Sequence, residues 1–181
     1  SNYSRDNIIS GNYIEDVGIY IANHSSARIS ENIIKNCGII ISNCGNIQIY
    51  ENDITSEYNG VTGIFLSNST AEIHFNRISG KVTYGLRVSN NSTVNATNNW
   101  WGNNTVTYIN STTTPPTSYN IWNKNSTVFY NPWLFLNIDN ISSTNSGGNT
   151  SITIDLTHNN QGGDTSSQGH IPNGIPLNFA T

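Results

Sequence analysis

The chain has 181 residues, of which 35% are hydrophobic and only 10% are charged, and its net charge at pH 7 is −4. Charged residues make up about a quarter of a typical soluble domain, so uncharged polar groups must cover most of this surface. Seven Lys and Arg residues face eleven Asp and Glu residues, and no basic cluster indicates nucleic-acid binding. No apolar run is long enough to predict a membrane-spanning helix.

Two short phrases alternate through the first hundred residues. One reads Ile-x-x-Asn-x-Ile, and its asparagines recur at intervals of 20, 20 and 24 residues. The other places Gly before two apolar residues that are separated by one position, with an asparagine two residues further on. The asparagines of the two phrases are Asn12, Asn32, Asn52 and Asn76, and Asn23, Asn43, Asn68 and Asn90. Repeats at intervals of about 20 to 25 residues indicate a solenoid.

The spacing inside each phrase predicts which solenoid forms. Apolar residues two positions apart point to one face of a strand, and no segment shows a helical period. We therefore predict an all-β fold, a right-handed parallel β-helix whose coils lie about 4.8 Å apart. Its interior would hold aliphatic stacks formed by Ile19, Ile21, Ile39, Ile41, Ile64, Leu66, Leu86 and Val88.

The asparagines are expected at turns, where Asn tolerates left-handed backbone and its amide can pair with the same residue on the next coil. A structural ladder is favoured over a ligand-binding role. Cys37 and Cys44 flank the predicted strand at 39–41. Seven residues of extended chain span about 20 Å, too far for a disulfide, so two buried free thiols are expected and no metal site.

After the fourth coil, aromatic residues replace isoleucine. Asn98 continues the asparagine spacing 22 residues after Asn76 and introduces Trp100 and Trp101. With Trp133 these tryptophans are predicted to cap the open end of the coils; a sugar-stacking platform is the alternative. Residues 108–125 are predicted to form an irregular loop. The predicted units are coils at 1–102, a capping loop and aromatic segment at 103–138, and an incomplete immunoglobulin-like domain at 139–181.

The stretch Asn98-Asn99-Trp100-Trp101-Gly102, followed later by Tyr130-Asn131-Pro132-Trp133-Leu134, resembles the end of the β-helix in adhesin-like surface proteins of methanogenic archaea. The resemblance covers about residues 1–138. It implies a long exported protein, often glycosylated, with β-helix and immunoglobulin-like modules in series and an anchor elsewhere. No catalytic residues come with that family. Residues 151–157 and 171–179 in turn resemble the opening strands of the immunoglobulin-like domains of invasin-type surface proteins.

Enzymatic function is the alternative, because a polysaccharide lyase or glycoside hydrolase on a β-helix needs converging carboxylates. Glu31 and Glu51 are the only carboxylates stacked at equivalent repeat positions. They form a weak candidate Ca²⁺ site, and a solvated edge is favoured. His74 has no carboxylate in phase to orient it as a base. A periplasmic metal-maturation factor is a third interpretation. The chain has no Met and only two Cys residues, which argues against it because soft metal sites prefer those ligands.

An outward-facing stripe is the best binding candidate: Tyr20, Ile40, Phe65 and Arg87 alternate with the inward aliphatic residues. Such a surface suits sugar rings or a protein partner. In the competing interpretation, which is favoured, a loop or a neighbouring module covers this stripe. The predicted function is a non-catalytic extracellular adhesin or stalk module that needs no cofactor. Its expected partners are a cell-surface glycan or protein receptor, adjacent modules, and a second copy that pairs through exposed strand edges.

Asn-x-Ser/Thr triplets, which are N-glycosylation acceptors in exported proteins, are frequent. Together with the low content of charged residues, they predict an extracellular, cell-surface location. The chain opens in mid-repeat, so the signal and anchor are expected outside this fragment. The candidate N-glycosylation sites are Asn23, Asn68, Asn91, Asn95, Asn110 and Asn125.

Overall fold

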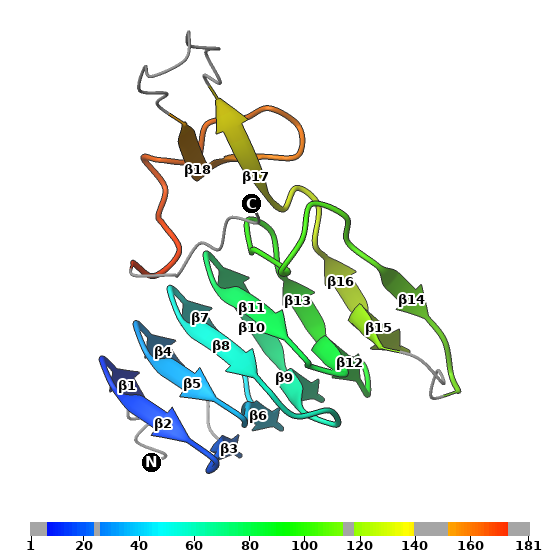
Figure 1. Cartoon of the computed structure of the whole chain (residues 1–181). Coiled ribbons are helices and arrows are strands. Elements are labelled where there is room, and N and C mark those ends of the chain that lie inside the picture. Colours follow the sequence, from blue (N-terminus) through cyan, green and yellow to red (C-terminus); the bar gives the residue numbers. More distant parts are fainter. Residues whose placement is uncertain (1–6, 24–25, 114–117, 140–151, 174–181) are drawn as a thin grey trace, which may run out of the picture.

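The computed structural model describes residues 7–23, 26–113, 118–139 and 152–173, and in these ranges it contains strands, turns and loops without a helix. The strands wind into a parallel β-solenoid of about four turns, with about 22 residues per turn (Figure 1). The predicted all-β solenoid is thereby confirmed.

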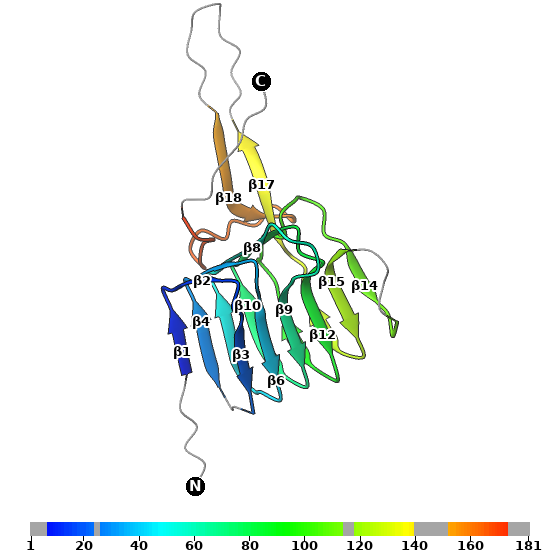
Figure 2. The same cartoon turned by 60° about the horizontal axis from the view of Figure 1, so that its bottom comes forward.

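Three parallel sheets form the sides of the solenoid. Sheet A has the order β1 (Asn7–Ser10), β4 (Ala27–Ser30), β7 (Ile47–Tyr50), β10 (Thr70–His74), β13 (Thr93–Asn95) and β16 (Thr127–Phe129). Sheet B consists of β2 (Tyr13–Glu15), β5 (Ile33–Lys35), β8 (Asp53–Ser56) and β11 (Arg77–Gly80). Sheet C has the order β3 (Ile19–Ala22), β6 (Ile39–Ser42), β9 (Thr62–Ser67), β12 (Tyr84–Ser89), β15 (Tyr119–Lys124) and β14 (Tyr108–Asn110), and Figure 2 brings its strands forward.

The core is a set of apolar columns in strict register. On sheet C, Ile19 pairs with Ile39, and Ile39 pairs with Ile64. All eight residues of the predicted aliphatic stacks are buried. On sheet B, Trp101 follows Ile78 in the column, because Arg77 bridges Trp100. Its side chain is 2% exposed and belongs to the solenoid core.

A column of buried asparagines joins sheet A to sheet B. The side-chain amide of Asn32 donates to the Oδ1 atom of Asn52 at 2.9 Å, and Asn52 donates to Asn76 at 2.9 Å. The backbone N–H of Asn32 reaches the same Oδ1 atom of Asn52 at 3.1 Å. Asn76 extends the column to Asn99 at 3.0 Å. Each Oδ1 therefore accepts two hydrogen bonds from the preceding coil, which fixes the coils in register.

Two details of the predicted ladders were wrong. The column continues through Asn99 and not Asn98, so the predicted register is one residue early at this coil. In this column the left-handed backbone lies one residue before each asparagine, at Gly11, Glu31, Glu51 and Phe75. The second set, Asn23, Asn43, Asn68 and Asn90, does adopt left-handed backbone, with φ between 48° and 57°. The side chain of Asn68 donates to Asn43, whereas that of Asn90 donates to Ser67.

Glycine in the second phrase allows successive coils to approach closely. A Cβ atom added at Gly63 would lie 2.7 Å from the carbonyl oxygen of Gly85 and 3.0 Å from a methyl group of Ile78. Gly18, Gly38 and Gly85 meet the next coil in the same way. The recurrence of glycine once in each coil thus reflects backbone packing between coils.

The predicted irregular loop at 108–125 was wrong in two places. β14 and β15 form within it and extend sheet C beyond residue 102, while β13 and β16 extend sheet A. β17 (Leu134–Asp139) and β18 (Thr153–Asn159) then pair antiparallel, and β17 crosses the predicted boundary between residues 138 and 139. Residues 140–151 and 174–181 of the predicted immunoglobulin-like segment lie outside the described ranges.

Both cysteines are buried and free, as predicted. Burial raises the pKa of the Cys37 thiol, since desolvation disfavours the thiolate. Cys44 lies beneath the coil corner, where its Sγ atom is 3.1 Å from the carbonyl oxygen of Ser42.

The first prediction concerns these thiols. Because both are buried and the raised pKa of Cys37 lowers its thiolate fraction, we expect them to react with a thiol reagent at pH 8 only after unfolding in urea. Time-resolved labelling with and without urea measures this. Rapid labelling of either cysteine in the native protein would contradict the packing described.

A second prediction concerns the buried asparagine column. Asn52→Ala should destabilise the protein by about 3 kcal/mol, because the buried backbone N–H of Asn32 loses its acceptor and the amide that donates to Asn76 and to the carbonyl oxygen of Ile29 is removed. Asn43→Gly is the control: the Asn43 side chain is exposed and glycine tolerates the left-handed backbone at this position, so the loss should stay below about 1 kcal/mol. Urea unfolding of both variants decides, and equal losses would contradict the account.

Candidate functional site

The stripe lies on one face of sheet C, as its residues pair across neighbouring strands. Tyr20 pairs with Ile40, Ile40 with Phe65, and Phe65 with Arg87. Tyr20 is 68% exposed and Ile40 is 40% exposed, while Phe65 and Arg87 are half-buried. In the described part of the chain, the Tyr20 end is therefore open to solvent.

Trp122 continues the stripe beyond Arg87, which the sequence reading missed. Arg87 pairs with Trp122 on β15, and the indole is only 1% exposed. Its Nε1 donates to the carbonyl oxygen of Ser111 at 3.2 Å, and Tyr84 packs against it with ring centroids 5.2 Å apart. The available signal was the stretch Ile121-Trp122-Asn123, which lies inside the predicted loop at 108–125.

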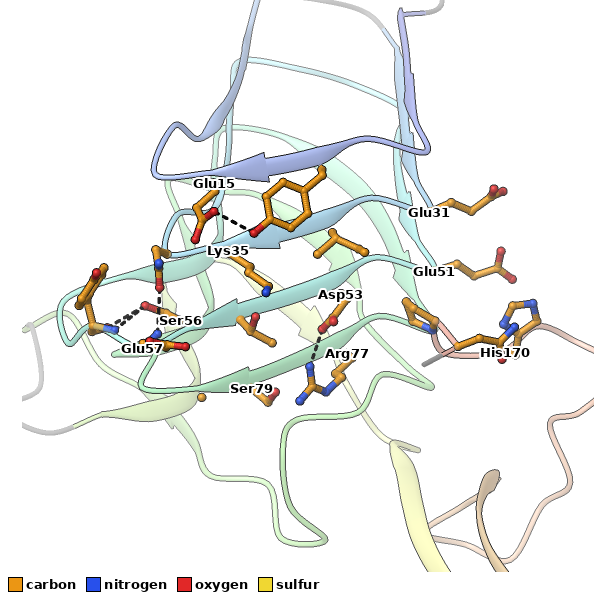
Figure 3. Close-up of a pocket in the computed structure, with 18 residues that line it drawn as sticks. Glu15, Glu31, Lys35, Glu51, Asp53, Ser56, Glu57, Arg77, Ser79 and His170 are labelled. Carbon is orange, nitrogen blue, oxygen red and sulfur yellow. Dashed lines mark hydrogen bonds and ion pairs between the residues drawn. The ribbon is translucent and has the colours of Figure 1, made fainter. Parts of the chain in front are cut away.

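A broad groove of about 1020 Å³ runs along the outer face of sheet B (Figure 3). Five of the eleven acidic residues of the chain line it, with Lys35 and Arg77 as the cations among them. Tyr13 and Tyr58 add exposed rings, and the segment at 170–173 borders it. The acidic residues are Glu15, Glu31, Glu51, Asp53 and Glu57.

Within the groove, several polar side chains already have partners. Arg77 and Asp53 form an ion pair with N and O atoms 2.7 Å apart, as their shared register implies. The Tyr13 hydroxyl donates to Glu15 at 2.8 Å, and this hydrogen bond is the main reason that the pKa of Tyr13 is raised. Glu31 and Glu51 point the same way at one end of the groove (Figure 3).

Glu31 and Glu51 alone do not complete a metal centre. Among the described residues, no group of three or more His, Cys, Asp and Glu side chains could hold a metal ion. Both glutamates adopt left-handed backbone at the corner before the asparagine column, with φ of 59° and 56°. Their shared orientation therefore follows from the corner geometry.

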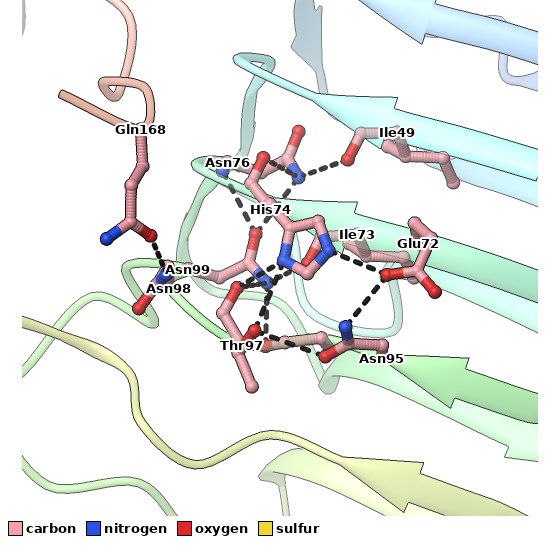
Figure 4. A network of polar contacts seen from close by, with 11 residues as sticks. Ile49, Glu72, Ile73, His74, Asn76, Asn95, Thr97, Asn98, Asn99 and Gln168 are labelled. Carbon is pink, nitrogen blue, oxygen red and sulfur yellow. Dashed lines mark hydrogen bonds and ion pairs between the residues drawn. The ribbon is translucent and has the colours of Figure 1, made fainter. Parts of the chain in front are cut away.

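His74 does have an orienting carboxylate, contrary to the prediction. Its Nε2 atom lies 2.9 Å from a carboxylate oxygen of Glu72, two residues earlier on the same strand face (Figure 4). Its Nδ1 atom lies 2.9 Å from the carbonyl oxygen of Thr97, and Asn95 donates to Glu72. Because both ring nitrogens are engaged, this network connects β10 to β13 and leaves no free nitrogen to act as a base.

The corner between sheets C and A explains three of the Asn-x-Ser/Thr triplets. Asn68-Ser69-Thr70, Asn91-Ser92-Thr93 and Asn125-Ser126-Thr127 each place a left-handed, exposed asparagine before a serine that turns into the corner. The backbone N–H groups of Cys44, Ser69 and Ser92 donate to the Oγ atoms of Ser69, Ser92 and Ser126, each at 3.1 Å. These triplets therefore have a structural cause in addition to any modification.

The other candidate acceptors differ in exposure. Asn23 and Asn110 are exposed, whereas Asn95 is half-buried. The Asn95 side chain donates to Glu72 and accepts from the Thr97 hydroxyl at 3.1 Å.

The aromatic residues after residue 98 divide between two clusters. Trp100 packs with Phe75 and Leu134 under the chain that returns from β18. Tyr108, Tyr130 and Trp133 stack in sequence at the end of the solenoid core, with ring centroids 4.9 Å and 6.3 Å apart. Gln168 contacts Asn98 at 3.4 Å, so the returning segment packs against the corner between sheets A and B.

The chain matches no protein-family model, no curated protein and no solved structure. Among the described residues, no helix combines the length and apolar character needed to cross a membrane.

A pH prediction follows from Asp155 on β18. The hydroxyl of Thr157 donates to its carboxylate at 2.7 Å and, with the backbone N–H of Thr157 and with His158, lowers its pKa below 3.8. A lowered folded-state pKa contributes stability that is present above about pH 4 and is lost as pH falls through the folded value.

We therefore expect the stability of the wild-type protein to fall below pH 4 more steeply than that of Asp155→Asn. Urea unfolding at several pH values between 2 and 7 measures the difference. Parallel curves for the two proteins would show that Asp155 does not contribute.

Proposed function

We propose that this chain is a non-catalytic module of an exported cell-surface protein, a stiff spacer that binds glycan or protein through the stripe on sheet C. The observation that carries the proposal is the exposed, in-register stripe, in which Tyr20 is 68% and Ile40 40% exposed. Contiguous apolar surface on a soluble protein usually marks an interaction site. Stiffness is supported by backbone hydrogen bonds and asparagine amides that join every coil to its neighbours.

The proposal includes a right-handed winding, an aromatic cap and an immunoglobulin-like continuation. Support for the cap comes from Trp133, whose Nε1 donates to the carbonyl oxygen of Asn104 at 3.3 Å while its ring stacks on Tyr130. The antiparallel pair of β17 and β18 is compatible with the first strands of a sandwich. An extracellular location is supported by Asn68, Asn91 and Asn125. Glycosylation requires an accessible asparagine, and these three side chains are exposed.

A polysaccharide-cleaving enzyme is the second candidate function. The observation favouring it is the sheet B groove, where Glu31, Glu51 and Asp53 lie within one open channel. Paired carboxylates can serve as acid and base or as nucleophile and acid in glycoside hydrolysis. Asp53, however, is held in an ion pair with Arg77.

A binding screen tests the proposed function. The double variant Tyr20→Ala/Phe65→Ala should bind any captured glycan or protein at least about tenfold more weakly, since aromatic side chains dominate such interfaces. Tyr13→Ala/Tyr58→Ala is the matched control, because it removes two exposed rings from the sheet B groove instead. The screen uses a glycan array, immobilised polysaccharides and cell-surface protein extracts, with release of reducing ends followed in the same wells.

Loss of binding in the control pair alone would move the site to the groove and contradict the proposal. Release of reducing ends by the wild-type protein would establish the enzymatic candidate.

A further inference from the structure

Charge is divided between the faces of the solenoid. The six strands of sheet C contain Arg87 and Lys124 and no Asp or Glu, although the chain carries eleven acidic residues. Five of those acidic residues instead line the groove on sheet B. An anion that approaches sheet C therefore meets two cations and no carboxylate on its strands, whereas in the groove five carboxylates outnumber Lys35 and Arg77.

Arg87 is held between two aromatic rings. Its guanidinium carbon lies 4.9 Å from the ring centroid of Phe65 and 4.4 Å from that of Trp122. These contacts cover the faces of the planar group and stabilise it by cation–π attraction. They leave the edge of the guanidinium, which carries its N–H donors, as the part able to bind another group.

No acceptor in the described part of the chain satisfies that edge. The Nε atom is buried and has no hydrogen-bond partner, and among the described residues no ion pair involves Arg87, so an anion would have to bind the terminal Nη groups. Arg77 provides the contrast, since its guanidinium is neutralised by Asp53 at 2.7 Å. A guanidinium held in one orientation presents its N–H donors as a planar fork. A carboxylate fits this fork because its two oxygen atoms can accept two parallel hydrogen bonds.

Lys124 places a second cation beside Arg87. Arg87 pairs with Trp122 and Ser89 pairs with Lys124, so the two cationic residues lie on adjacent strands, offset by two positions on the same face. Such diagonal neighbours are about 7–8 Å apart, within reach of two long side chains.

We propose that sheet C binds a linear sugar chain that carries carboxylates, with one carboxylate on Arg87, a second negative group near Lys124, and sugar rings along Phe65, Ile40 and Tyr20. This inference rests on the proposed binding role of the stripe and names the ligand class. A sugar is favoured over a peptide because the stripe repeats with the coil spacing of about 4.8 Å, close to the length of one sugar unit, and offers an exposed tyrosine ring.

The test compares galacturonate hexamer with its fully methyl-esterified form, which has the same backbone without the charges. Binding to the whole chain is measured by titration calorimetry at low and at high salt. Arg87→Gln should weaken binding of the acid hexamer at least tenfold, and Lys124→Gln should weaken it less. Arg28→Gln is the matched control: it removes one cation that lies over the Tyr50 ring on sheet A, 4.5 Å from its centroid.

The expected result is tighter binding of the acid hexamer than of the ester, weakened by salt, lost in Arg87→Gln and kept in Arg28→Gln. Thermal unfolding of each variant is recorded, and Lys124→Gln tests the same site if Arg87→Gln is unstable. Equal binding of acid and ester through Tyr20 and Phe65 would overturn the assignment of the ligand class while preserving the proposed function. Equal losses in Arg87→Gln and Arg28→Gln, or no binding of the acid hexamer, would overturn the assignment itself.

Discussion

The register between coils is the constraint on which this structure depends, and the buried asparagine column enforces it. Asn32, Asn52, Asn76 and Asn99 are all inaccessible to solvent, so their amide groups have only one another and nearby carbonyl groups as partners. A slip of one residue in any coil would leave these groups unsatisfied in the core, at a cost of about 1–3 kcal/mol for each. The glycines add a steric condition, because only an unsubstituted Cα lets Gly63 lie against Gly85.

Fixed register turns a local pattern of residues into continuous surfaces. Residues at equivalent positions of successive coils line up, so the residue type at one outward position of each coil determines whether a continuous stripe or groove forms. On sheet C the outward residues of the stripe are apolar or aromatic, apart from Arg87, whose guanidinium lies between two aromatic rings. On sheet B the outward residues are mixed, with Glu15 and Asp53 beside Lys35 and Arg77, and three more glutamates that line the groove lie outside the strands. The two faces therefore differ in charge and ring content although they share one backbone, and this difference underlies the proposed preference for acidic sugars on sheet C.

Much of the solenoid could be predicted because its periodicity is local. Alternation placed the isoleucines inward, and the repeat spacing placed the stripe on one face. The prediction failed where that signal was weak or interrupted. Adjacent Asn98 and Asn99 allowed a count that was one residue off, and only the buried amide of Asn99 decides between them. The long insertion after β13 interrupts the repeat spacing, so β14 and β15 were not predicted, nor was the position of Trp122 on β15. The contact between Glu72 and His74 does not follow from the repeat, because it joins residues two apart on one strand and not equivalent positions of neighbouring coils.

The most direct test of the central claim, that sheet C is the binding face, is a map of backbone amide chemical shifts during titration with galacturonate hexamer. The account predicts that the largest changes fall on β6, β9, β12 and β15 around Phe65, Arg87 and Trp122, with sheet B unchanged. Changes concentrated on β2, β5, β8 and β11 along the acidic groove would contradict it.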